Sequence, residues 1–137
     1  RELALLRAVP IFAPLPPPVL EQLASSLVPL RVAAGKEVFR QGDVGDRFYV
    51  IAEGEVDVAI GREGTRVLAG GDSFGEIALL REMPRTATVR ARTDVELYAL
   101  ERDEFIAAVT GHAPSAEAAD AVIATRLGSL RPGVASL

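Results

Sequence analysis

The residues best suited to chemistry lie in the segment 70–91, where charged side chains interrupt a β-prone pattern. Gly75 and Glu76 precede the short apolar run 77–80, which we interpret as one or two helical turns that begin near Glu76. The first turn of a helix has free backbone N–H groups, and these favour an anion. Arg85 follows a proline where the chain returns to a strand, and a guanidinium can donate two hydrogen bonds to a phosphate.

Glu76 adds a hydrogen-bond acceptor to the same segment. A carboxylate only accepts, and it therefore suits a sugar hydroxyl. Gly75 has no side chain, so the backbone can come close to a ligand. Phosphate donors and a ribose acceptor on one stiff loop against a β-roll predict a nucleotide pocket.

The rest of the chain changes its hydrophobic period twice, from helical to β-prone and back. Short apolar runs separated by glycines fill the middle, and Val56, Val58 and Ile60 alternate with polar or small residues as in a half-buried strand. The sequence predicts one α+β domain over residues 1–137. Its parts are helices over about 2–27, an eight-stranded antiparallel β-roll of jelly-roll type over about 28–101, and helices over about 103–130.

Three local signals define the predicted helices more closely. Prolines 16–18 suit a first helical turn and predict a helix over about 17–27. Asp103 is the predicted N-terminal cap of a helix that Gly111 closes. A longer helix is predicted from about Ser115 to Leu130, and its apolar face is a candidate surface for pairing with a second copy.

The amino-acid composition excludes several classes of function. Of the 137 residues, 49% are hydrophobic and 25% are charged, which is typical of a globular domain. The absence of cysteine excludes disulfides, thiolate metal sites and a cysteine nucleophile. His112 is the single histidine, which excludes the histidine-rich metal site of a cupin enzyme, and we expect no catalysis. The net charge of −4 argues against a nucleic-acid-binding surface.

Apolar runs are too short for a membrane span, which needs about 18 residues or more, and we expect no membrane contact by this domain. The first residues do not have the basic-then-apolar pattern of a signal peptide, and we expect none. The first residue is Arg1 rather than Met, from which we expect a domain excised from a longer protein. We expect a cytoplasmic location, which includes the cytoplasmic part of a membrane protein.

Two motifs stand in the chemical segment, FGEIAL at 74–79 and PRTA at 84–87. They resemble the phosphate-binding cassette of the cyclic nucleotide-binding domain family, which reads Phe-Gly-Glu-x-Ala-Leu, a few variable residues, then Pro-Arg-(Ala/Ser/Thr)-Ala. The spacing does not depart from the family pattern. Upstream, the letters GD at 42–43, FYVI at 48–51 and GEV at 54–56 match the family's glycine turns and early hairpin. The resemblance covers roughly residues 3–130.

The resemblance implies a role for each cassette residue. Arg85 would bind the cyclic phosphate, Glu76 would accept from the ribose 2′-hydroxyl, and Thr86 would line the phosphate or the purine edge. Backbone N–H groups for phosphate or sugar would come from Gly75, Ile77 and Ala78, and the expected ligand-binding set is completed by Phe74 and Ala87. The last helix would close over the base. Its candidate lid residues are Val122, Ile123, Arg126 and Leu127.

The resemblance also implies a regulatory sensor that binds a cyclic nucleotide as ligand, with no cofactor or metal, and controls an output domain absent from this chain. A threonine after the cassette arginine, here Thr86, favours cyclic GMP in some members because its hydroxyl can meet the guanine amino group. Many alanines and arginines with the single lysine Lys36 suggest a GC-rich bacterial genome, and cyclic AMP is favoured with cyclic GMP as the alternative. A ligand-free scaffold domain is the other alternative, although such relatives usually lose the arginine or glutamate retained here.

Overall fold

The computed structural model describes residues 2–61 and 64–130, with the backbone alone for residues 128–130. The helices in these ranges are α1 (Glu2–Ala8), α2 (Pro17–Ser26), α3 (Glu76–Leu80), α4 (Arg102–Thr110) and α5 (Ala113–Leu130). The strands are β1 (Val28–Val32), β2 (Glu37–Phe39), β3 (Arg47–Glu53), β4 (Glu55–Ala59), β5 (Thr65–Ala69), β6 (Ser73–Phe74), β7 (Thr88–Ala91) and β8 (Val95–Glu101).

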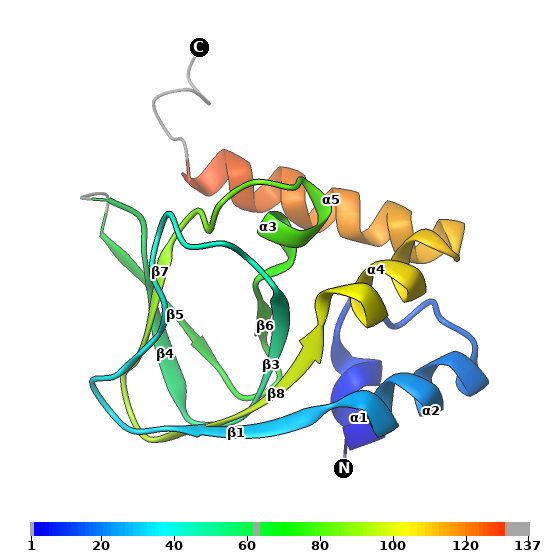
Figure 1. Ribbon diagram of the computed structural model, residues 1–137, viewed down its shortest axis with the longest axis horizontal. Coiled ribbons are helices and arrows are strands. Elements are labelled where there is room, and N and C mark those ends of the chain that lie inside the picture. The colour runs from blue at the N-terminus through cyan, green and yellow to red at the C-terminus, as the bar shows by residue number, and fades with distance from the viewer. Residues whose placement is uncertain (1, 62–63, 131–137) are drawn as a thin grey trace.

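The strands form two four-stranded sheets. One has the order β1-β8-β3-β6 and the other β2-β7-β4-β5, and every pair is antiparallel. The strands make the roll on one side of the molecule, and helices α1, α2 and α4 lie beside it. Helix α5 runs along α3 and α4 (Figure 1). The predicted α+β fold, an eight-stranded antiparallel β-roll with flanking helices, is confirmed.

Strand β3 separates two hydrophobic cores. Phe48 and Val50 belong to the core under the helices, whereas Tyr49 and Ile51 belong to the core inside the roll. Successive side chains of a strand point to opposite faces, so a strand covered on both faces needs apolar residues at consecutive positions. This explains why the run 48–51 is continuously apolar instead of alternating.

The core under the helices is built on three phenylalanines. Phe12, Phe48 and Phe105 are completely buried. The ring centroids of Phe48 and Phe105 lie 4.7 Å apart in a stacked arrangement, and those of Phe12 and Phe48 lie 5.3 Å apart edge-to-face. Residues of α1, α2, α4 and α5 pack around them. This core holds the helices on the outer face of the β1-β8-β3-β6 sheet.

Two predicted helix starts differ from the structure. Helix α4 begins at Arg102 after Glu101 and has no side-chain cap, so the predicted cap at Asp103 is wrong. The reason is that β8 stays paired with β3 as far as Glu101 and passes directly into the helix, which leaves Asp103 in its first turn. Helix α5 begins at Ala113, before the predicted Ser115, whose buried hydroxyl donates a 2.6 Å hydrogen bond to the carbonyl of Ile11.

Other boundaries agree more closely. The predicted helix over 17–27 is α2, which ends at Ser26. Strand β6 was not predicted, because its two residues lie in the segment that interrupts the strand pattern.

In the described part of the chain, no helix combines the length and hydropathy that crossing a membrane requires.

Candidate functional site

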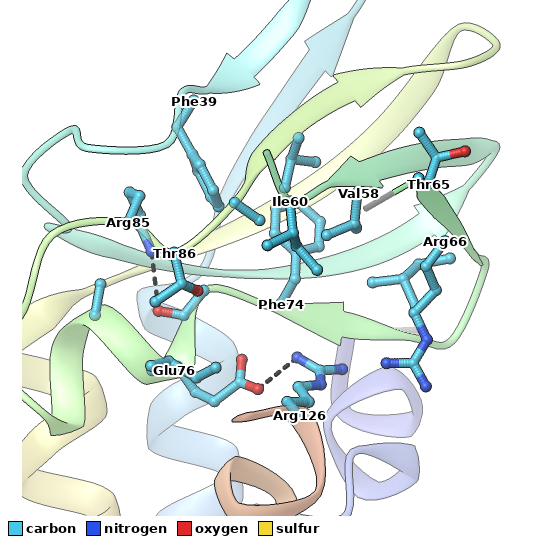
Figure 2. Close-up of a pocket in the computed structure, with 17 residues that line it drawn as sticks. Phe39, Val58, Ile60, Thr65, Arg66, Phe74, Glu76, Arg85, Thr86 and Arg126 are labelled. Atoms are coloured by element: carbon cyan, nitrogen blue, oxygen red, sulfur yellow. Dashed lines mark hydrogen bonds and ion pairs between the residues drawn. The ribbon is translucent and has the colours of Figure 1, made fainter. Parts of the chain in front are cut away.

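A cavity of about 300 Å³ opens between strands β4 and β5, helix α3 and the end of α5 (Figure 2). This volume is at the lower end of the range of about 300–1,000 Å³ that small-molecule sites occupy. All the cassette residues predicted to bind ligand line it: Phe74, Gly75, Glu76, Ile77, Ala78, Arg85, Thr86 and Ala87. The tertiary structure thus brings both halves of the motif to one cavity.

Gly75 makes the close approach of the two halves possible. It precedes α3 with a left-handed φ of 100°, which a residue with a side chain adopts at a cost. A Cβ atom at this position would lie 2.9 Å from Nη1 of Arg85 and 3.1 Å from the carbonyl oxygen of Arg47. The space beside the backbone of Gly75 is therefore taken by the Arg85 guanidinium.

Arg85 is the central cation of the site. Its side chain is 3% exposed. Nη1 donates to the carbonyl of Gly75 at 2.9 Å, and Nη2 donates to the carbonyl of Arg47 at 2.7 Å. Nε is buried and has no hydrogen-bond partner within the described residues. These partners are neutral, and within those residues no carboxylate forms an ion pair with Arg85, so its charge is free to meet an anionic ligand.

The surroundings of Arg85 hold it in place and remove it from water. Its guanidinium carbon lies 4.1 Å from the centroid of the Phe39 ring and 5.9 Å from that of Tyr49. Burial lowers the pKa of Arg85, and the electrostatic effects of Tyr49 and nearby carboxylates oppose this shift. An arginine nevertheless stays protonated in proteins. The result is a desolvated positive charge beside aromatic rings.

The loop between β2 and β3 supports the backbone of Arg85. The N–H of Gly42 donates to the carbonyl of Arg85 at 2.8 Å, and the N–H of Arg85 donates to the carbonyl of Asp43 at 2.8 Å. A Cβ atom on Gly45 would lie 2.5 Å from the Cβ of Ala78, which is closer than real Cβ atoms approach. The glycine turns of this loop therefore let it pack against α3 and Arg85 together.

Glu76 is the acidic residue among the described residues of the cavity lining. It is 1% exposed. Oε1 accepts from Nη1 of Arg126 in an ion pair, while Oε2 is buried without a hydrogen-bond partner in the described structure. Most buried polar atoms are paired, so an orphaned carboxylate oxygen at a cavity indicates a missing donor.

The candidate lid residues of α5 separate into two groups. Arg126 lines the cavity, and Figure 2 shows its guanidinium facing Glu76. Val122 packs against the core under the helices, Ile123 is 1% exposed, and Leu127 is half-buried. None of these three belongs to the described lining of the cavity. Their role as a lid over a bound base stays a prediction.

Sequence reasoning missed the wall of the cavity that β4 and β5 provide. Val58 of β4 and Leu68 of β5 form its apolar part, together with Ile60, which directly follows β4. Arg66 lies directly opposite Val58 in the antiparallel pair and therefore shares its face of the sheet. An arginine at an inward-facing strand position was a signal in the sequence, but it depends on a pairing register that the sequence alone does not supply.

The described lining of the cavity carries more positive than negative charge. The described lining contains three arginines, Arg66, Arg85 and Arg126, against the single carboxylate of Glu76. Within the described ranges, no cluster of three or more His, Cys, Asp or Glu side chains could hold a metal ion. The arrangement suits an organic anion with a hydrogen-bond donor and an apolar part.

Many solved structures are similar to this chain, and three of them illustrate the likeness. Two are 32% identical and cover 78% of it: the cAMP-bound PfPKA-R, with a TM-score of 0.75, and the regulatory domain of Toxoplasma gondii PKA with cAMP, with a TM-score of 0.73. This chain spans 40% and 42% of their lengths. The sensor domain of the transcriptional regulator DNR from Pseudomonas aeruginosa is 27% identical, with a TM-score of 0.78, and 94% of this chain and 95% of that one are covered.

The family comparison agrees with the cassette and with the β-roll. The profile of the family described as "Cyclic nucleotide-binding domain" matches residues 29–112, which is more than half of the chain. The matched range contains the complete cassette and all strand residues except Val28, the first residue of β1. The chain therefore belongs to the cyclic nucleotide-binding domain family.

Proposed function

We propose that the cavity binds a cyclic nucleotide, with cyclic AMP favoured, and that the domain acts as a regulatory sensor without catalytic activity. The proposal rests mainly on the burial of Arg85 and on its hydrogen-bond partners. Its guanidinium is almost completely buried, has neutral carbonyl partners and keeps Nε unpaired. A buried charge without a counter-ion is costly, and a singly charged cyclic phosphate would supply that counter-ion.

The remaining walls fit the other parts of a nucleotide. Glu76 has one unpaired oxygen at the cavity, which supports its proposed role as acceptor of a ribose hydroxyl. The half-buried side chains of Val58, Ile60 and Leu68 offer an apolar surface for a purine face. The backbone N–H groups of residues 75, 77 and 78 are the proposed further donors to phosphate or sugar.

The choice of base rests on two observations. Two similar structures, each 32% identical, are described as bound to cAMP, which supports cyclic AMP as the ligand of this chain. Thr86 lines the cavity, and its hydroxyl keeps cyclic GMP as the competing ligand. A titration with both nucleotides separates these alternatives.

The proposed regulatory output uses the helices around the roll. Helix α3 belongs to the cassette and contacts both α4 and α5, so a change at the ligand reaches the flanking helices directly. Ligand binding can shift their arrangement only through different affinities for two states. We propose that these helices control an output domain in a longer protein with a cytoplasmic location. Pairing of α5 with a second copy stays a prediction, since Ala116, Ala119 and Val122 pack on their own chain.

Calorimetric titration with cyclic AMP and cyclic GMP tests the proposal, with Arg85→Ala as the variant. We expect wild-type binding at micromolar concentration or tighter. Arg85→Ala should weaken it about 100-fold or more, since removing one partner of a buried ion pair costs ~3–5 kcal/mol. The matched control is Arg31→Ala, because Arg31 is an 86% exposed arginine that pairs with Glu96 on the strand β8.

Two results would contradict the proposal. One is the absence of heat and of thermal stabilisation when wild type meets either nucleotide, which would favour a ligand-free scaffold. The other is equal binding by wild type and by folded Arg85→Ala. A thermal melt of each variant shows whether it folds.

A further inference from the structure

Phe39 ends strand β2 and is turned into the cavity by a bulge in that strand. Glu37 lies opposite Arg90 of the neighbouring strand β7. Phe39 lies opposite Val89, so the register shifts between these two positions of β2. Residues two apart in a regular strand share a face, but Arg90 is exposed and Val89 lines the cavity. The bulge therefore sends Glu37 and Phe39 to opposite faces of the sheet.

The Phe39 ring lies against the guanidinium of Arg85. The guanidinium carbon is 4.1 Å from the ring centroid, and Figure 2 shows the Phe39 side chain reaching into the cavity on that side. The Nη atoms of the same group donate to the carbonyls of Gly75 and Arg47 at 2.9 and 2.7 Å. The ring face attracts the cation without using these N–H groups, and Nε stays unpaired within the described residues.

The kind of partner that holds Arg85 decides what is left for a ligand. A carboxylate would hold the side chain but would also neutralise the charge that an anionic ligand needs. In the part of the chain that the structure describes, backbone carbonyls and aromatic rings hold the guanidinium instead. The side chain is therefore fixed while its charge remains uncompensated.

Fixing Arg85 before a ligand arrives favours binding. A free arginine side chain loses considerable rotamer entropy when a ligand immobilises it. Preorganisation removes that cost from the binding step. Because the ring covers one face of a side chain that is 3% exposed, it also keeps water away from the charge.

We propose that Phe39 is a positioning residue for phosphate recognition: its ring holds the Arg85 guanidinium in place before a ligand binds, so that a preorganised cation meets the cyclic phosphate. This inference rests on the proposed function of the cavity. The ring acts through the arginine and not by contact with the nucleotide. Replacing the ring should therefore weaken binding only when Arg85 is present.

The test is a double-mutant cycle between the ring and the cation. Affinity for cyclic AMP is measured for wild type, Phe39→Leu, Arg85→Ala and the double variant, by calorimetry and, for the weak complexes, by NMR titration. Phe39→Leu should weaken binding by about 3- to 30-fold, the range to which a cation–π contact corresponds. In the Arg85→Ala background the same substitution should change affinity by less than about twofold.

Two further substitutions separate positioning from loss of packing. Phe39→Tyr keeps a ring face for the cation and should keep most of the affinity. Phe12→Leu removes a completely buried ring from the core under the helices, so it should lower stability and leave the affinity unchanged. A thermal melt of each protein shows whether it is folded at the titration temperature.

Fluorinated phenylalanines test the electrostatic contact at nearly constant size. Ring fluorines draw electron density from the ring face and so weaken its attraction for a cation. Analogues with one, two and three fluorines at position 39 should lower the affinity for cyclic AMP step by step. The same analogues at position 12 should leave it unchanged.

The Nε–H signal of Arg85 gives a spectroscopic measurement before any ligand is added. It is assigned by its absence in Arg85→Ala. We expect a narrow, slowly exchanging signal in wild type and in Phe39→Tyr, and a broader, faster-exchanging one in Phe39→Leu. Phe12→Leu should keep the wild-type signal.

The outcomes distinguish this inference from the proposed function. An equal loss of affinity with and without Arg85 would mean that the ring contacts the nucleotide itself, and it would overturn the positioning role while nucleotide binding stands. A loss below about twofold in Phe39→Leu would overturn that role too. Absence of cyclic AMP binding to wild type would overturn both. If Phe39→Leu fails to fold, the fluorinated proteins decide: an unchanged affinity contradicts the proposal, and a stepwise loss supports it.

Discussion

The two faces of strand β3 differ in what they bury. On the helix side, Phe48 packs against two other phenylalanine rings in an apolar core. On the inner side, Tyr49 stacks on Phe74 with ring centroids 5.1 Å apart, and Arg85 lies near both Tyr49 and Phe39. One face therefore packs apolar rings against one another, whereas the other surrounds a cation with aromatic rings.

This difference separates stability from binding within a single sheet. Close packing of apolar side chains stabilises the fold, and gaps in it are costly. A buried guanidinium with neutral partners contributes little to folding or opposes it, but it is prepared for an anion. Substitutions on the helix side should therefore change mainly the free energy of unfolding, and those beside the cavity mainly the affinity.

The largest expected effect is that of Phe48→Ala. Removing a completely buried aromatic ring leaves a cavity, and we expect the free energy of unfolding to fall by ~3–5 kcal/mol. Urea denaturation measures this change. The control is Val44→Ala, since Val44 is 86% exposed and its substitution should change stability by less than about 0.5 kcal/mol. A loss below about 1 kcal/mol for Phe48→Ala would contradict the closed core described here.

Gly45→Ala should affect both properties, because Gly45 lies where the loop meets the site. The new Cβ would be 2.5 Å from the Cβ of Ala78 and 3.3 Å from the guanidinium carbon of Arg85. We expect ~1–3 kcal/mol of destabilisation from overpacking, together with weaker nucleotide binding. The double variant with Ala78→Gly removes the closest atom and should recover part of the stability. If it recovers none, contact with Ala78 is not the cause.

Ser115→Ala tests the attachment of α5 to the helix-side core. The Ser115 hydroxyl is buried, and its removal leaves the Ile11 carbonyl without this donor. We expect a loss of ~1–3 kcal/mol in urea denaturation. In the matched control Thr125→Ala, an exposed hydroxyl that donates to Ala121 in the same helix is removed, with a change below about 0.5 kcal/mol. Equal effects of the two substitutions would argue against a special role for Ser115.

The smallest effect is expected for Arg66→Ala, which changes the exposed rim of the cavity. Arg66 lines the cavity but is exposed to solvent. Its attraction for a nucleotide anion should resemble an exposed ion pair, ~0.2–1 kcal/mol, so affinity should fall by about 1.4- to 5-fold at low salt. Calorimetry at two salt concentrations checks this, because screening should reduce the effect. An undiminished loss at high salt would instead indicate a desolvated contact.

The order of elements and the cassette could be predicted because their signals are local. The helical period around the prolines, the alternation at 56–60 and the glycine turns each describe one segment, and the segments together require a β-roll with helices. The predicted cap at Asp103 is wrong because the start of that helix depends on a contact between distant segments. Pairing of β8 with β3 extends the strand to Glu101, and such pairing overrides a local capping preference.

By itself, the sequence determined which residues to expect at the cavity: Gly75, Glu76 and Arg85 stand in a motif whose spacing is visible without coordinates. Only the tertiary structure decided their surroundings. It brought Arg126 to Glu76 across 50 residues and set Arg66 opposite Val58. Those contacts depend on strand register and on how a helix packs, which are settled by burial of apolar surface over the whole domain and not by any single segment.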